Sequence, residues 1–76
     1  MGNKKEALKL DLILKDELDE LVRDYIPSFG RQADIDIRDN LFRLELKNLS
    51  MKERNSLMSK TVYLLKTYGK FKTPKI

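Results

Sequence analysis

The sequence predicts an α+β fold in the order β-α-β-β-α, with one three-stranded sheet that carries two helices on one face. Three observations lead to it: alternating leucines near the N-terminus, a central segment that pairs with itself as a hairpin, and a capping box before an amphipathic stretch. A chain of 76 residues forms one core. We therefore expect a single small domain over residues 1–76, with a short flexible N-terminus (1–6) and a basic C-terminal tail (70–76).

The first strand is expected from Leu8 to Leu14. Every second residue of this segment is a leucine. A strand places these leucines on one side, whereas a helix scatters them around its whole surface. The alternative is one long helix over residues 4–26 and an all-α chain, which the scattered leucines disfavour.

A helix is expected to follow from Asp16, because the apolar spacing changes to that of a helix. The residues on its apolar side are Leu18, Leu21, Val22, Tyr25 and Ile26. Asp16 is placed to cap this helix and Pro27 to end it. In the connector over residues 27–32, we expect Gly30 to take a positive φ angle and Phe29 to pack on the core.

The segment over residues 33–46 is expected to form a β-hairpin with Asp39-Asn40 as its two-residue turn. In this register, the facing residues are Arg38 with Leu41, Ile37 with Phe42, Asp36 with Arg43 and Ile35 with Leu44. Apolar residues then mostly face apolar residues and an acid faces a base, so the pattern favours this register.

The last helix has signals at both ends. Ser50 and Glu53 form a capping box, and Gly69 is placed to stop the helix. At 100° per residue, its apolar arc consists of Met51, Leu57, Met58, Thr61, Val62, Leu64, Leu65 and Tyr68.

The composition argues against catalysis. The chain has no His and no Cys, so it lacks an imidazole base, a thiol nucleophile and the common zinc ligands. Asp34 and Asp36 lie on the outer face of the predicted sheet near Arg43, and Asp39 belongs to the turn, so a metal site is not expected. We expect no enzymatic activity, no cofactor and no metal.

A basic surface on the last helix and tail predicts nucleic acid as the partner. Its residues, which we call the lysine face, are Lys52, Ser59, Lys60, Tyr63, Lys66, Lys70, Lys72 and Lys75. Lysines along a helix can follow a phosphate backbone, and Tyr63 can stack on a base. The leading hypothesis is a non-enzymatic accessory or regulatory protein of DNA transactions. The alternative is an ordinary solvated helix surface on a chain of net charge +4.

An acidic surface on the first helix predicts a different function. The residues of this acidic face are Asp16, Glu17, Glu20 and Asp24. They could dock into the basic groove of a protein partner, as an inhibitor or adaptor would. A small core without disulfides also favours self-association, so in this hypothesis the inhibitor or adaptor is a homodimer that docks to its partner through the acidic helix or an open sheet edge.

The sequence predicts a cytoplasmic protein without membrane contact. No apolar run approaches the ~18 residues that a membrane-spanning helix needs. No signal peptide precedes the charged start.

The expected order of elements resembles that of the DinI-like small damage-response proteins. The segments that carry the resemblance are Leu8-Lys9-Leu10-Asp11-Leu12, Ile35-Asp36-Ile37-Arg38 with Asn40-Leu41, and Ser50-Met51-Lys52-Glu53-Arg54. The resemblance implies an α+β fold and a role in modulating recombinase filaments, for which members of that family use an acidic final helix. The final helix here is basic, so no functional residue is carried over.

Overall fold

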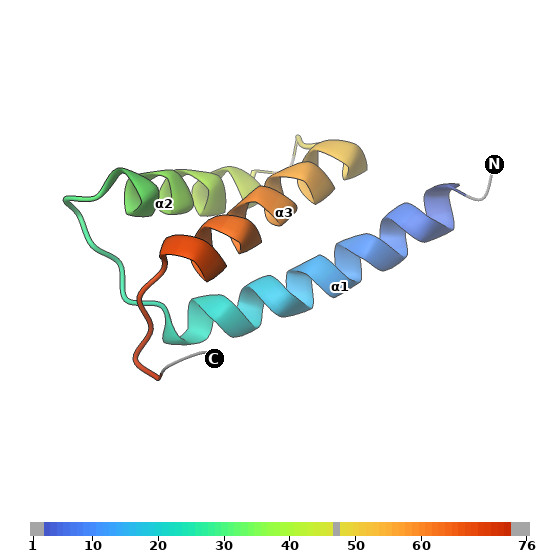
Figure 1. Ribbon diagram of the computed structural model, residues 1–76. Coiled ribbons are helices and arrows are strands. Elements are labelled where there is room, and N and C mark those ends of the chain that lie inside the picture. Colours follow the sequence, from blue (N-terminus) through green and yellow to red (C-terminus); the bar gives the residue numbers. More distant parts are fainter. Residues whose placement is uncertain (1–2, 47, 74–76) are drawn as a thin grey trace.

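The computed structural model describes residues 3–46 and 48–73 and contains three helices: α1 (Asn3–Asp24), α2 (Gln32–Leu44) and α3 (Met51–Tyr68). Helices α1 and α2 both pack against α3 but do not contact each other (Figure 1). Apart from one isolated β-bridge, no strand occurs in the described residues. The fold is therefore all-α, and the predicted α+β fold with a three-stranded sheet is wrong.

The segment predicted as a strand and a helix forms one 22-residue helix, α1. The side chains that α1 packs towards the core include Leu14, Leu18 and Leu21, and Tyr25 continues the same side just past the end of the helix. Their spacing of four, three and four residues is that of one helix side. The strand from Leu8 to Leu14 is therefore wrong, and Asp16 lies inside α1 instead of capping it. Leucine and lysine are good helix formers, which favours the helix even where its leucines stay exposed.

Asp11 shows the same correction at a single residue. The predicted strand places it on the outer face of the sheet, whereas in α1 it is buried against α3. There, its Oδ1 accepts a hydrogen bond of 3.1 Å from Nε of Arg54. The pair is partly buried and joins the first half of α1 to the first turn of α3.

The predicted hairpin over residues 33–46 is also wrong, because most of this segment forms helix α2. The side chains that α2 turns towards the core are Asp34, Ile37, Leu41 and Leu44. Asp39 and Asn40, the predicted turn, lie inside the helix. Arg43 does not face Asp36 across a hairpin; its Nε instead lies 3.3 Å from Oδ2 of Asp39, one turn earlier on the same helix.

Helix α3 confirms the prediction for the last helix at both ends. Ser50 Oγ accepts a hydrogen bond of 3.1 Å from the Glu53 amide, and the Glu53 side chain accepts one of 3.3 Å from the Ser50 amide. Gly69 is the C-terminal cap. Of the predicted apolar arc, Met58, Thr61, Val62 and Leu65 are buried, while Met51 and Tyr68 remain exposed.

Gly30 does not act as the sequence suggests, whereas Gly69 ends α3 as expected. No described glycine has a positive φ angle, so the expectation for Gly30 is wrong. At Gly69, an added Cβ would lie 2.5 Å from the Leu65 carbonyl oxygen, so lack of space explains the glycine. Phe29 is 74% exposed instead of packed on the core, and the Arg38 guanidinium lies 4.7 Å from its ring centre.

The core lies where both outer helices meet α3, and Ile37, Met58 and Leu65 are its most deeply buried apolar side chains. The chain after α3 adds Phe71, whose ring meets that of Tyr25 edge to face at 6.4 Å. Backbone hydrogen bonds on either side of this pair join the segment to the end of α1. The first part of the basic tail is thus held against α1.

A buried polar cluster joins the ends of all three helices. Tyr25 Oη donates a 2.5 Å hydrogen bond to Oδ1 of Asp34, whose residue is only 1% exposed. Nε of Arg31 lies 3.3 Å from the other Asp34 oxygen, as an ion pair without hydrogen-bond geometry. The same guanidinium donates to the carbonyl oxygen of Tyr68 at 2.6 Å. Burial and the hydrogen bond to Asp34 raise the pKa of Tyr25 well above its ordinary value.

Candidate nucleic-acid interface

The predicted lysine face lies on the outer side of α3 and on the segment that follows. Its described members, Lys52, Ser59, Lys60, Tyr63, Lys66, Lys70 and Lys72, are all exposed. Lys75 lies outside the described residues. On α3, the four buried side chains occupy one side of the helix, and the lysines therefore occupy the side that faces water.

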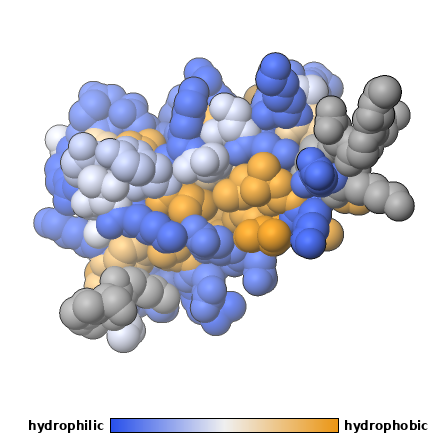
Figure 2. All heavy atoms as spheres, turned by 45° about the vertical axis from the view of Figure 1, so that its right-hand side comes forward, coloured by the Kyte–Doolittle hydropathy of each residue, from blue (hydrophilic) through white to orange (hydrophobic). Residues whose placement is uncertain are grey.

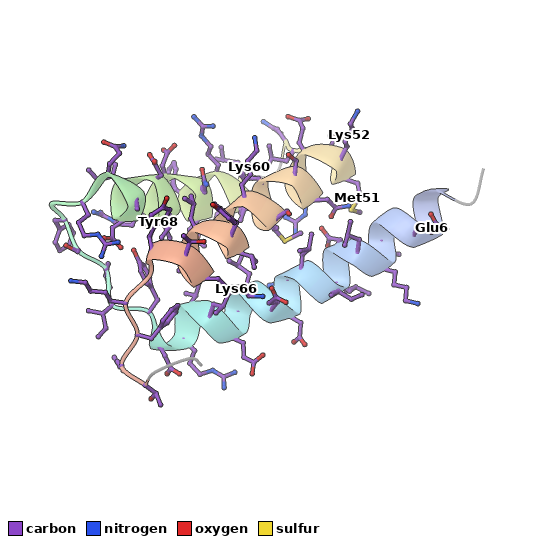
Figure 3. All side chains as sticks on the ribbon, in the orientation of Figure 1. Glu6, Met51, Lys52, Lys60, Lys66 and Tyr68 are labelled. Carbon is purple, nitrogen blue, oxygen red and sulfur yellow. The ribbon has the colours of Figure 1, made fainter. Side chains whose placement is uncertain are left out.

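A hollow between α2 and α3 brings three cationic side chains together. It has a volume of about 340 Å³ and is lined by Arg43, Leu49, Lys52, Glu53, Ser56, Leu57 and Lys60. Figure 3 shows Lys52 and Lys60 on the side of α3 that is turned away from α1. The one acid in the hollow, Glu53, already accepts the Ser50 amide in the capping box. The hollow therefore combines three cationic side chains, one carboxylate and the Ser56 hydroxyl, and Arg43 also pairs with Asp39 of α2.

Other members of the lysine face lie outside this hollow. Tyr63 is 62% exposed, so its ring is accessible for stacking. Lys66 lies on the side of α3 towards α1, where its Nζ is 2.9 Å from Oε1 of Glu17 (Figure 3). Lys70 and Lys72 follow the end of α3, in the segment bonded to the end of α1. The lysine face is thus divided: Lys52 and Lys60 lie beside α2, and Lys66 lies beside α1, where Glu17 pairs with it.

The acidic face of α1 is partly engaged within the protein. Asp16 and Glu20 are exposed, whereas Glu17 and Asp24 are half-buried. Glu17 pairs with Lys66, and Asp24 has an interaction partner as well. The backbone carbonyl of Asp24 also accepts a hydrogen bond of 2.8 Å from the Lys72 amide. Only two of the four predicted acids are therefore exposed for a partner.

Sequence reasoning missed Arg43 as part of the cationic hollow. The hairpin prediction paired Arg43 with Asp36, on the outer face of a sheet. In α2, the same residue lies beside the start of α3 and joins Lys52 and Lys60. The helical spacing of Ile37, Leu41 and Leu44 was the signal that could have placed it there.

Apolar side chains are also exposed on this protein, as Figure 2 shows for one face, where a hydrophobic area is surrounded by hydrophilic side chains. On α1 they include Leu8, Leu10, Leu12 and Ile13, and on or beside α2 they include Phe29, Ile35, Phe42 and Leu46. A groove of about 410 Å³ separates the two helices, with Met58 and Arg54 of α3 among its lining residues. These surfaces are distinct from the lysine face.

Within residues 3–46 and 48–73, no helix is long and apolar enough to cross a membrane. The same residues contain no group of three or more acidic side chains placed to hold a metal ion. Comparisons of the chain with protein-family models, with curated proteins and with solved structures found no match.

Proposed function

We propose that this protein binds the nucleic-acid backbone without catalysing a reaction, as an accessory or regulatory protein of DNA transactions. The observation that carries the proposal is the hollow in which Arg43 of α2 meets Lys52 and Lys60 of α3. Two helices thus supply cations to one place, which a single solvated helix surface does not do.

Phosphate is the ligand that this hollow suits best. Guanidinium and ammonium groups donate charge-assisted hydrogen bonds to phosphate oxygens, and the Ser56 hydroxyl adds a neutral donor. Such contacts carry no information about base sequence, so the expected binding tolerates unrelated sequences. Lys70 and Lys72, in the segment that follows α3, would contact phosphates further along the strand, with Tyr63 available to an unpaired base.

The acidic face supports the competing docking hypothesis less well. Glu17 is already paired with a lysine of α3, and Asp24 is engaged within the protein. The remaining acids, Asp16 and Glu20, are exposed in the middle of a helix that also carries Lys15 and Arg23. A partner with a basic groove would therefore meet two acids instead of four.

The first prediction tests the cationic hollow with the double variant Lys52→Gln/Lys60→Gln. Its affinity for unrelated 20-bp duplexes should fall by a similar factor for each sequence. The slope of log affinity against log salt should decrease by nearly two units, because each phosphate contact contributes about 0.9. Fluorescence anisotropy over a salt series measures both quantities.

The matched control is Lys9→Gln/Lys15→Gln on α1, which removes the same two charges from the net charge of +4. It should keep the salt slope of the parent protein nearly unchanged. Equal losses in the two variants would mean that overall charge, not the hollow, binds DNA. A parent protein that fails to bind at low salt would refute the proposed function outright.

A further inference from the structure

The outer side of α2 carries an apolar stripe that no other part of the described chain covers. Ile35 is 44%, Phe42 65% and Leu46 50% exposed, although each is large and apolar. Ile35 and Phe42 are seven residues apart and therefore lie on one side of the helix, and Leu46 follows just past its end. This stripe points away from the core, which α2 contacts through Ile37 and Leu41.

A hollow of about 590 Å³ lies along this stripe, lined by Ile35, Arg38, Asp39, Leu41, Phe42 and Glu45. In knobs-into-holes packing, a hole is formed by four residues of one helix at positions i, i+3, i+4 and i+7. Four residues of α2 have this spacing: Ile35, Arg38, Asp39 and Phe42. An apolar side chain from a second helix would fill such a hole. The shape therefore fits a helix lying along α2.

We propose that a second copy of this chain supplies that helix, so that two α2 helices pack antiparallel across a two-fold axis near Leu41 and Phe42. A two-fold axis brings the same side of each helix together, so each side must be complementary to itself. One side of the stripe carries Arg38 and Glu45. In this arrangement, Arg38 of each copy faces Glu45 of the other.

The opposite side of the stripe is also complementary to itself, with the two-fold axis at nearly the same position. It carries Asp39 and Arg43, which already form an ion pair within α2 at 3.3 Å. Across the axis, Asp39 of each copy faces Arg43 of the other. Both sides of one stripe are thus complementary to their own copies, whereas an unrelated partner helix would not explain this order of charges.

With the axis near Leu41 and Phe42, the two Phe42 rings meet at the centre of the interface, next to the hollow of each copy. A single pair of 13-residue helices buries less area than the about 1,600 Å² of stable complexes. We therefore expect a weak dimer, with a Kd on the order of micromolar.

The dimer is tested first by mass, using light scattering over a concentration series from about 1 to 500 μM, a range that spans micromolar affinity. The parent should pass from 9.0 kDa towards twice that mass. Phe42→Ala should remain monomeric at all concentrations. The control Leu12→Ala, on a side chain 62% exposed on α1, should dimerise like the parent.

Charge reversals then test the register. Arg38→Glu and Glu45→Arg should each weaken the dimer at least tenfold, because like charges face each other across the axis. The double variant Arg38→Glu/Glu45→Arg should restore it, since the pair is only exchanged. The double variant can restore the dimer only if residue 38 of one copy faces residue 45 of the other. If the single variants failed to dimerise because they were unfolded, combining the two substitutions would not restore the dimer.

Cysteine cross-linking gives a third measurement, because the chain has no natural Cys. Phe42→Cys lies at the axis and should form a disulfide-linked dimer on oxidation. Ile35→Cys lies about 20 Å from its mate at 1.5 Å per residue, so it should stay unlinked. A monomer at every concentration, or a dimer that Leu12→Ala breaks and Phe42→Ala does not, would overturn the inference. These results are independent of DNA binding by Lys52 and Lys60.

Discussion

At the residue scale, the contact between Tyr25 and Asp34 sets the position of α2. The Asp34 carboxylate is buried, and burial of such a group is costly unless hydrogen bonds and opposite charge compensate it. The Tyr25 hydroxyl and the Arg31 guanidinium provide that compensation from outside α2. An aspartate in this first turn also interacts favourably with the N-terminal end of the helix dipole.

The second prediction is that Tyr25→Phe lowers the free energy of unfolding by about 1–3 kcal/mol at neutral pH, because Asp34 loses a buried donor. The difference between variant and parent should shrink above about pH 10. There, unfolded Tyr25 releases its proton, whereas the raised pKa keeps it on the folded protein, so the parent loses stability as pH rises.

Urea unfolding at pH 7 to 11, followed by circular dichroism, measures this prediction. Tyr63→Phe is the control, since its side chain is largely exposed and its loss of a hydroxyl should leave unfolding nearly unchanged at neutral pH. A Tyr25→Phe protein as stable as the parent would show that Arg31 alone compensates Asp34.

At the scale of elements, α3 was predictable because its signals are local. The Ser50-Glu53 box fixes its start, Gly69 fixes its end, and the residues between them repeat with a helical period. Each signal involves residues close in sequence, so no knowledge of distant packing is required. The exposed position of Lys52 and Lys60 followed from the same periodicity.

The helix predicted from Asp16 is confirmed as the second part of α1, but the first part of α1 and the whole of α2 were missed because their exposed apolar residues disguise the helical period. Leu8, Leu10 and Leu12 are exposed in α1, and together with Leu14 they create an alternation typical of a strand. In α2, Ile35 and Phe42 are exposed, so they do not fit the apolar side of the helix. In the sequence they instead matched a hairpin, in which Ile35 pairs with Leu44 and Phe42 with Ile37. The Arg43 part of the candidate site was missed with α2, because its position depends on α2 being a helix.

The third prediction concerns the start of α3. Ser50→Ala should lower the free energy of unfolding by about 1 kcal/mol, because the Glu53 amide loses its acceptor. Ser56→Ala, inside the same helix, should be neutral or slightly stabilising since alanine is the better helix former. Thermal or urea unfolding distinguishes the two. Equal effects would mean that the capping box adds nothing beyond helix propensity.

At the scale of the whole molecule, the three-helix arrangement places the cationic hollow and the apolar stripe of α2 on different sides, although their residues are close together in the sequence. Helix α3 lies between its neighbours and presents Lys52 and Lys60 beside α2, while the stripe around Phe42 lies on another side of α2. The two hollows share no lining residue. Lys52 and Lys60 belong only to the proposed DNA surface and Phe42 only to the proposed dimer, so each contact can be removed alone, whereas Arg43 takes part in both.

The last prediction follows from this separation and compares four proteins: the parent, Lys52→Gln/Lys60→Gln, Phe42→Ala, and all three substitutions combined. The lysine variant should keep the concentration-dependent mass of the parent, because its substitutions lie outside the α2 stripe. The lysine substitutions should lower the DNA affinity of each protomer by the same factor with or without Phe42→Ala, since effects at sites without shared partners add. Phe42→Ala itself should weaken binding only to duplexes long enough for two protomers. On such a duplex, a dimer has a higher overall affinity than a single protomer because its second protomer is already held close to the DNA, and Phe42→Ala removes this advantage. A lysine variant that no longer dimerises would instead show that a single surface serves both contacts.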